Sequence, residues 1–185
     1  TSSLTYAGEK TGLKALSEIT TEDESRLSSG LGELDRVLGG GMVAGSAILI
    51  SGNPGAGKST LLLQVLCSVL TEGVMMYVTG EESLSQVAAR AQRLKLKTDK
   101  IMVMAETSIE IILSSWSKSQ PSICVIDSIQ AMQTSLTDSA PGSVSQVRES
   151  ASKLIRQAKQ TSTILVMVGH VTKDGNLAGP RVLEH

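Results

Sequence analysis

Aromatic residues are almost missing from this chain. Its 185 residues include no phenylalanine, two tyrosines and one tryptophan, so aromatics make up 2% of the sequence. We therefore expect a core of Leu, Ile, Val, Met and Ala, a composition that suits buried parallel strands covered by helices. The same scarcity leaves few aromatic faces on which the bases of a nucleic acid could stack.

Cysteine is also scarce. Cys67 and Cys124 each lie in an apolar run, and they do not form a CxxC pair. We expect both to be small buried hydrophobic residues in a reducing compartment. Without paired cysteines, the sequence predicts no zinc site within this chain.

Long hydrophobic runs and an excess of one charge are absent as well. No apolar run approaches about 18 residues, and the N-terminus has no basic segment followed by an apolar stretch. We therefore expect a cytoplasmic protein without membrane contact. The net charge of −1 and the pI near 6.1 do not indicate a strongly basic nucleic-acid binder, although a local patch or an assembled ring could still bind DNA.

Strands and helices alternate along most of the chain. Residues 1–25 are rich in Ser, Thr and Glu and indicate a linker or arm, whereas 26–185 fit one domain. Hydrophobic periodicity predicts strands at 47–51, 74–79, 101–104, 122–127 and 163–169, helices at 59–71, 83–96, 108–118 and 144–160, and a loop at 133–143. Ser83 with Gln86, and Thr107 with Glu110, fit capping boxes. Such alternation predicts an α/β fold with a mostly parallel sheet, whose ligands bind at the carboxyl ends of the strands.

The strongest motif is a phosphate-binding loop between the first predicted strand and the helix after it. Gly52, Asn53, Pro54, Gly55, Ala56, Gly57, Lys58 and Ser59 fit G-x-x-x-x-G-K-[ST], and Thr60 completes the predicted nucleotide-binding set. Backbone N–H groups of such a loop, with the positive end of the helix, surround phosphates. We expect Lys58 to neutralise the β and γ phosphates of ATP and the Ser59 hydroxyl to coordinate Mg²⁺.

Acidic residues and one histidine follow the other predicted strands. Asp127 closes an apolar strand, and downstream of a phosphate-binding loop it is the expected second Mg²⁺ residue. Glu81 and Glu82 follow the strand at 74–79; either can be a solvated helix start or the carboxylate that polarises the attacking water, and we favour Glu81. His170 ends the last strand, where we prefer a γ-phosphate sensor to a plain loop residue.

Basic residues are weaker indicators. Four of them lie on the polar side of the helix at 144–160, where a solvated face is the simpler interpretation: Arg148, Lys153, Arg156 and Lys159. Lys173 and Arg181 lie in the glycine-containing segment after the last strand. A basic loop near the ligand edge predicts candidate contacts with DNA phosphates.

Several segments together resemble one family. The stretches 26–30 and 34–41 resemble the entry to RecA/KaiC-type ATPase cores. The segments that resemble the bacterial RadA (Sms) family closely are 77–83, 141–144, 169–175 and 177–185. The resemblance implies a RecA-like P-loop core in which Lys58 and Ser59 are the Walker A residues, Asp127 the Walker B residue, Glu81 the catalytic glutamate and His170 the sensor. It also implies that the segments after Asp127 and His170 are loops that face DNA.

The family implies an activity as well. Its members resemble DnaB-like hexameric motors, DNA-dependent ATPases that act on single-stranded or branched DNA and promote branch migration in DNA repair and recombination, with RecA as a candidate partner. The family's zinc module, Lys-Asn-Arg-Phe-Gly motif and Lon-protease-like domain do not occur in this chain. We therefore expect an ATPase core that binds MgATP but hydrolyses it slowly. Two other functions fit the same core, a KaiC-type phosphotransferase and a nucleotide-switched interaction module.

Overall fold

The centre of the molecule is a five-stranded parallel sheet. The computed structural model describes residues 12–19, 26–53, 57–69 and 71–170. The strands stand in the order β3 (Ala47–Gly52), β7 (Ile164–His170), β6 (Ile123–Asp127), β4 (Met75–Thr79) and β5 (Ile101–Ala105), and every neighbouring pair is parallel. The predicted α/β, RecA-like P-loop fold is confirmed.

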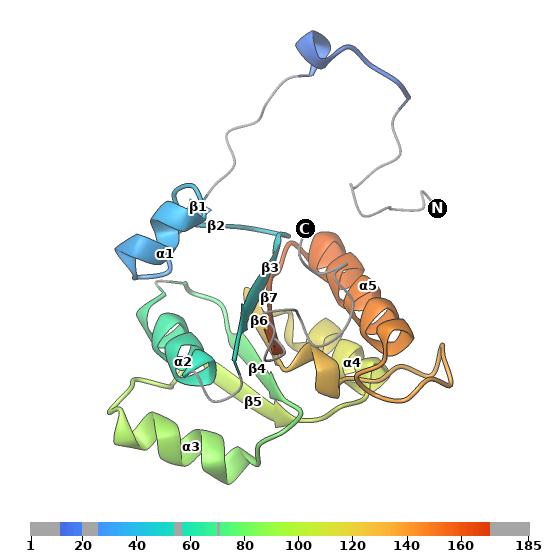
Figure 1. Cartoon of the computed structure of the whole chain (residues 1–185). Helices are drawn as coiled ribbons and strands as arrows, with labels where there is room; N and C mark the ends of the chain where they lie inside the picture. Colours follow the sequence, from blue (N-terminus) through green and yellow to red (C-terminus); the bar gives the residue numbers. More distant parts are fainter. Residues whose placement is uncertain (1–11, 20–25, 54–56, 70, 171–185) are drawn as a thin grey trace.

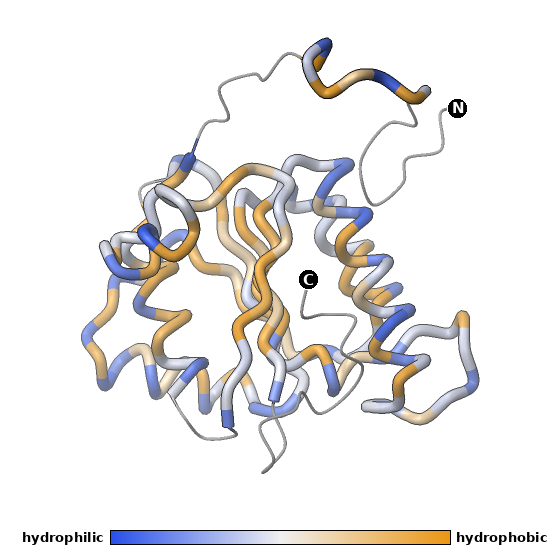
Figure 2. Tube along the Cα trace, turned by 45° about the horizontal axis from the view of Figure 1, so that its top comes forward, coloured by the Kyte–Doolittle hydropathy of each residue, from blue (hydrophilic) through white to orange (hydrophobic). Residues whose placement is uncertain are grey.

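Helices cover both faces of the sheet. Helices α2 (Lys58–Ser68) and α3 (Leu84–Arg93) lie on one face, and α4 (Ile109–Ser119) and α5 (Val144–Thr161) lie on the other (Figure 1). Because successive side chains of a strand point to opposite faces, Met75 and Tyr77 join the core under α2, whereas Met76 and Val78 join the core under α4 and α5. Figure 2 shows the most apolar stretches in these central strands.

The two cores contain the few aromatic side chains that the structure describes. Trp116 and Tyr77 are both fully buried among aliphatic residues. The Trp116 indole donates hydrogen bonds of 3.2 Å to the hydroxyls of Thr161 and Thr163, so its polar atom is satisfied inside the core. Cys124 is buried as expected, but Cys67 on α2 is only partly buried.

A short ribbon and helix precede the sheet, in a region for which the sequence pattern predicted no element. Strand β1 (Arg26–Leu27) pairs antiparallel with β2 (Met42–Val43), and α1 (Gly32–Val37) lies between them. Asp35 ties this unit together, because its carboxylate accepts hydrogen bonds from the Ser28 hydroxyl at 2.5 Å and the Ser29 amide at 2.7 Å. Of the predicted arm at 1–25, the structure describes 12–19, which contains the 3₁₀ turn η1 (Leu16–Glu18) with no buried residue.

One predicted capping box is confirmed and the other is wrong. Ser83 and Gln86 exchange both hydrogen bonds of a capping box at the start of α3. At the start of α4 the N-cap residue is Ser108, which makes no capping bond with its side chain. Glu110 turns instead to the loop 133–143, where its carboxylate accepts hydrogen bonds from the Thr134 hydroxyl at 2.5 Å and the Ser135 amide at 3.1 Å.

The loop 133–143 is also held by a buried side-chain amide. It connects α5 to the 3₁₀ turn η2 (Ile129–Ala131) that follows β6. The Gln146 side chain accepts a hydrogen bond from the Thr134 amide at 2.9 Å and donates to the carbonyls of Thr134, Thr137 and Ser139. Since Gln146 is itself 3% exposed, the loop is fixed to the start of α5.

None of the helices in the described part of the chain combines the length and the hydrophobicity needed to cross a membrane.

Candidate nucleotide-binding site

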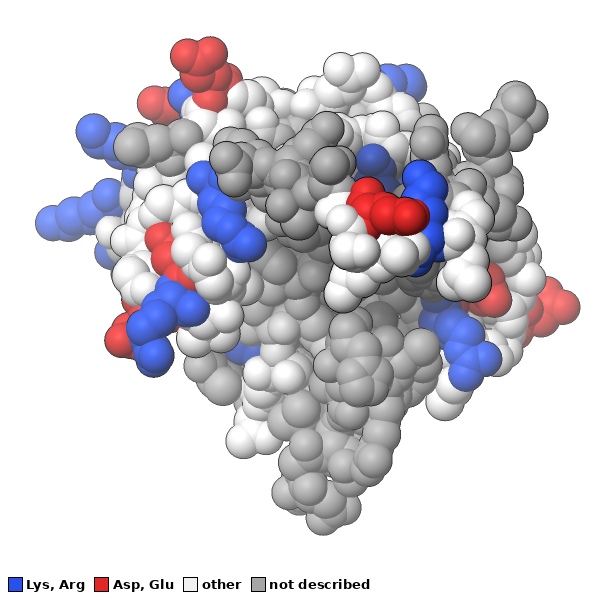
Figure 3. Space-filling view, turned by 90° about the horizontal axis from the view of Figure 1, so that it is seen from above, with Lys and Arg blue, Asp and Glu red and all other residues white. Residues whose placement is uncertain are grey.

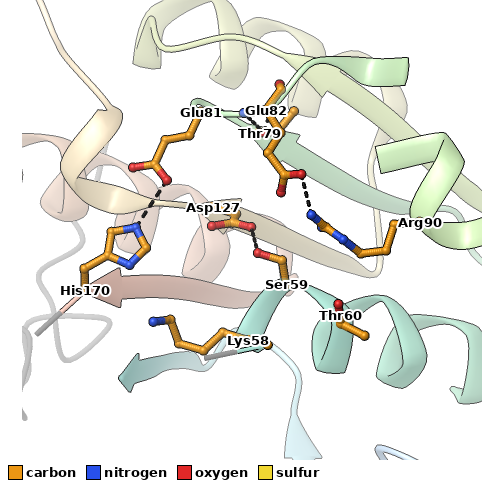
Figure 4. A pocket seen from close by; sticks show the side chains of 10 residues that line it. Lys58, Ser59, Thr60, Thr79, Glu81, Glu82, Arg90, Asp127 and His170 are labelled. Carbon is orange, nitrogen blue, oxygen red and sulfur yellow. Dashed lines mark hydrogen bonds and ion pairs between the residues drawn. The ribbon is translucent and has the colours of Figure 1, made fainter. Parts of the chain in front are cut away.

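The sheet register brings the carboxyl ends of four strands together. Thr79 of β4 lies beside Asp127 of β6, and Gly52 of β3 lies beside His170 of β7. A cavity of about 560 Å³ opens at this edge (Figure 4), a size typical of small-molecule sites. The lining residues are Gly57, Lys58, Ser59, Thr60, Thr79, Glu81, Glu82, Arg90, Asp127 and His170.

The phosphate-binding loop occupies one wall of this cavity. Strand β3 ends at Gly52 and α2 begins at Lys58, after Gly57 in the left-handed conformation with a φ of 79°. The first turn of α2 therefore opens into the cavity with its free N–H groups and partial positive charge, which suits an anionic phosphate. Pro54, Gly55 and Ala56 of the motif lie outside the described residues.

Lys58 places a buried cation beside this helix end. The side chain donates hydrogen bonds to the carbonyls of Gly52 at 2.7 Å and Asn53 at 2.8 Å, and the residue is 9% exposed. Burial lowers the pKa of the Lys58 ammonium, and the negative charges of Asp127 and Glu81 oppose that shift. The ammonium is thus held by neutral carbonyls that a phosphate oxygen, with its negative charge, can replace as acceptor.

Two hydroxyl groups meet one carboxylate next to Lys58. The Ser59 hydroxyl donates a hydrogen bond to Asp127 Oδ2, and the Tyr77 hydroxyl donates to the same oxygen at 2.6 Å. Asp127 is 4% exposed. Burial, followed by the charge of Asp127, raises the pKa of Tyr77, so this phenol stays a hydrogen-bond donor. An alcohol oxygen beside a carboxylate fits Mg²⁺, which binds few protein oxygens and completes its octahedron with phosphate and water.

The described residues contain no group of three or more His, Cys, Asp or Glu side chains that could hold a metal ion by themselves. A divalent ion between Ser59 and Asp127 would therefore depend on the oxygens of a nucleotide. This donor set matches a P-loop site rather than a free-standing metal centre.

The two adjacent glutamates have different partners. Glu81 Oε1 accepts a hydrogen bond from the Ser128 hydroxyl at 2.9 Å, and Glu81 Oε2 lies 3.2 Å from Nε2 of His170. Glu82 is ion-paired with Arg90 of α3, and both side chains are mostly buried. The charge of Glu82 is therefore neutralised within the protein. Glu81 retains its interaction with Lys58 across the cavity, which favours Glu81 for the action on water; this role and that of His170 stay predictions.

His170 is fixed by its backbone and its ring. The Gln130 side chain contacts both the amide and the carbonyl of His170 at 3.4 Å. The ring bonds Glu81 through Nε2, while Nδ1 is buried without a hydrogen-bond partner in the part of the chain that the structure describes. A histidine in this position joins the end of β7 to the carboxylate at the end of β4.

Sequence reasoning missed Tyr77, Thr79, Arg90 and Ser128. Ser128 could have been suspected as the neighbour of Asp127, and Thr79 as the polar end of its strand. Tyr77 and Arg90 gave no signal, because a tyrosine within an apolar strand and an arginine on an amphipathic helix are both ordinary. Lys173 and Arg181, the candidate DNA contacts, lie outside the described residues.

The basic helix face is separate from the cavity. Lys153 of α5 pairs with Glu110 at 3.3 Å, and no residue of α5 lines the cavity. On the face shown in Figure 3, basic and acidic side chains of the described residues are interspersed, without a broad patch of one sign. A solvated helix face remains the simplest interpretation of Arg148, Arg156 and Lys159.

Comparison with known proteins agrees with the fold. The model of the family "ATPase: KaiC" matches residues 27–122, just over half of the chain, including the phosphate-binding loop and both glutamates. The chain belongs to the KaiC family of ATPases. Membership of an ATPase family implies that the chain binds a nucleotide.

Relatives within this ATPase family extend the match to nearly the whole chain. The chain is 57% identical over 180 residues to the DNA repair protein RadA of Pseudomonas aeruginosa and 58% identical over 182 residues to that of Escherichia coli, in each case over 97% of this chain and 40% of the relative. RadA of Bacillus subtilis is 48% identical over 92% of the chain and 37% of the relative. The predicted resemblance to bacterial RadA is confirmed, and the chain spans about 40% of the length of these relatives.

Proposed function

We propose that this chain is the MgATP-hydrolysing core of a RadA-type DNA-repair ATPase that acts in the bacterial cytoplasm. The observation that carries the proposal is the arrangement of one cavity: Lys58 and Ser59 at the phosphate-binding loop, Asp127 bonded to Ser59, and Glu81 beside them. The family match supports an ATPase, and the relatives' name supports a role in DNA repair.

Each side chain has a distinct task in the proposed reaction. Lys58 and the N-terminus of α2 bind the phosphates and stabilise the charge that develops on the transferring phosphoryl group. Ser59 and Asp127 would hold Mg²⁺, whose positive charge would offset the negative charge of the phosphates. Glu81 accepts a hydrogen bond from the attacking water and orients it in line with the leaving group. His170 senses whether the terminal phosphate is present and passes this change on to the segment that follows β7.

The contacts of Glu81 suggest how DNA is coupled to hydrolysis. Ser128 precedes η2 and the loop 133–143, and His170 precedes the segment that contains Lys173 and Arg181. These two segments resemble the DNA-facing loops of the family. We propose that DNA bound by these loops shifts Ser128 and His170 and thereby changes the two contacts that restrain the Glu81 carboxylate. Assembly into a hexamer, branch migration with helicase action, and cooperation with RecA belong to the same proposal.

Phosphate release by the full-length protein, measured with and without single-stranded or branched DNA, tests this function. We expect DNA to raise the rate in the wild type, and the variants Lys173→Ala and Arg181→Ala to need more DNA for the same stimulation. Transfer of the terminal phosphate to a protein side chain, without free phosphate, would establish the phosphotransferase instead. Binding of ATP with neither reaction would establish a nucleotide-switched interaction module.

A further inference from the structure

One carboxylate oxygen of Asp127 accepts hydrogen bonds from two hydroxyl groups. Ser59 and Tyr77 both donate to Oδ2, whereas the structure gives Oδ1 no hydrogen bond among the described residues. Of the two donors, Ser59 belongs to the phosphate-binding loop, where its oxygen is required by a metal ion. Tyr77 has no such second task.

Tyr77 reaches this carboxylate from the protein interior. It pairs with Val125 in the sheet, and Asp127 is two residues further along the same face of β6. The ring is 0% exposed and belongs to the core under α2 and α3, among Leu62, Leu66 and Val87. The surrounding aliphatic side chains therefore hold the ring in one orientation, and its hydroxyl meets Asp127 at 2.6 Å. This is a short bond to an ionised acceptor, and so a strong one.

We propose that Tyr77 is a positioning residue for the metal site. It acts by fixing the rotation of the Asp127 carboxylate. The proposal rests on the proposed MgATP function. With Oδ2 held by the phenol, Oδ1 is kept in place to accept a hydrogen bond from a water of the Mg²⁺ shell. The Ser59 hydroxyl can then turn its lone pair to the metal without releasing the carboxylate. Removal of residues that orient a metal-binding group typically costs about 10- to 100-fold in metal affinity or activity.

The variant Tyr77→Phe removes the hydroxyl and keeps the ring. Hydrolysis is measured as phosphate release at saturating ATP over a range of Mg²⁺ concentrations, together with binding of a fluorescent ATP analogue in EDTA. We expect the Mg²⁺ concentration at half-maximal rate to rise about 10- to 100-fold. The maximal rate at saturating Mg²⁺ and the metal-free binding of the analogue should change little, because Lys58 and the loop are untouched.

Thr163→Val is the matched control. It also removes a buried hydroxyl, which donates a hydrogen bond to the Pro121 carbonyl at 2.9 Å. Thr163 directly precedes β7, so it lies at the amino ends of the strands, away from the cavity. This variant should melt earlier than the wild type with an unchanged Mg²⁺ requirement. If Tyr77→Phe likewise lowers only the melting temperature, the tyrosine is structural and the proposal is overturned.

A second measurement separates this proposal from the proposed function. In an Asp127→Asn background, Tyr77→Phe should add no further shift in the Mg²⁺ requirement, because the group that it orients no longer serves the metal. A full additional shift would show that Tyr77 acts independently of Asp127 and would also overturn the proposal. A wild type whose nucleotide turnover is indifferent to Mg²⁺ would instead refute the MgATP function itself.

Discussion

Glu81 and Glu82 are neighbours, but replacing them should affect different properties: Glu82 the stability of the fold, and Glu81 the rate of hydrolysis. Glu82 pairs with Arg90, and the two side chains are 24% and 22% exposed, whereas the Glu81 side chain is 48% exposed and contacts a hydroxyl and a histidine ring. The same Glu→Gln change, which removes a charge and preserves shape, therefore tests an ion pair at position 82 and the proposed water-orienting carboxylate at position 81.

The structure sets the size of each effect. Exposed ion pairs contribute about 0.2–1 kcal/mol and broken buried pairs cost about 3–5 kcal/mol, so a pair of intermediate burial implies about 1–2 kcal/mol for Glu82→Gln. For a chain of this length that corresponds to a melting temperature lower by about 2–8 °C. Glu81→Gln should change stability by no more than about 0.5 kcal/mol, since the side chain is half exposed. Its rate of hydrolysis should fall by about 10²- to 10⁴-fold, the usual contribution of a positioned general base.

Thermal melting and steady-state phosphate release, measured on both variants at saturating MgATP, check these values. Glu82→Gln should keep a rate within about tenfold of the wild type, because it disturbs position and not the reacting group. The reasoning is refuted if Glu82→Gln is the slower enzyme at an unchanged melting temperature. A Glu81→Gln variant that loses nucleotide binding would equally contradict it, since Glu81 would then contribute to the binding of ATP and not only to its hydrolysis.

Other predictions follow from single contacts. Lys58→Ala should fold normally, as judged by its melting curve, and lose at least about 10²-fold in hydrolysis, because a preorganised charge at the phosphates is gone. Burial raises the pKa of Glu110, but hydrogen bonds from Thr134, from backbone amides and from Lys153 outweigh it and lower the pKa from 4.5 to about 2. Glu110 thus stabilises the fold above pH 4.5, and this contribution disappears as the pH falls toward 2, so the melting temperature of Glu110→Gln should depend less on pH over that interval. Gln146→Leu should leave loop carbonyls unpaired and make residues 133–143 more sensitive to limited proteolysis than the same loop in the wild type; equal cleavage rates would contradict the anchoring role.

Local sequence signals sufficed for much of the fold and for most of the residues that line the cavity. Gly52 to Ser59 is contiguous, and Asp127 and His170 each end an apolar strand, so their place at one sheet edge follows from parallel pairing alone. The pairs Tyr77–Asp127, Ser128–Glu81 and Arg90–Glu82 depend on which strand neighbours which and on how α3 turns back over β4. Periodicity carries no information on strand order, and these contacts could not be predicted.

The same limit explains one wrong local prediction and one unit for which no element was predicted. Thr107 and Glu110 have the spacing of a capping box, but the loop 133–143 returns to the start of α4 and offers Glu110 stronger donors. The unit at 26–46 consists of a six-residue helix and two-residue strands, which are too short for a periodic pattern. Its stability comes from Asp35 and from packing, and neither is visible in hydrophobicity.

The position of β3 has a consequence for how the protein is made. Within the described sheet β3 is an outer strand, and its one neighbour there is β7, the last strand that the structure describes: Ala47 pairs with Leu165. During synthesis β3 leaves the ribosome before β7 and cannot form this pairing until β7 has followed. Contacts between segments so far apart in sequence form slowly, and strand edges that are still unpaired promote aggregation. Because Gly52 and His170 meet only through the pairing of β3 with β7, ATP binding by ribosome-bound chains of increasing length is expected to report when that pairing forms.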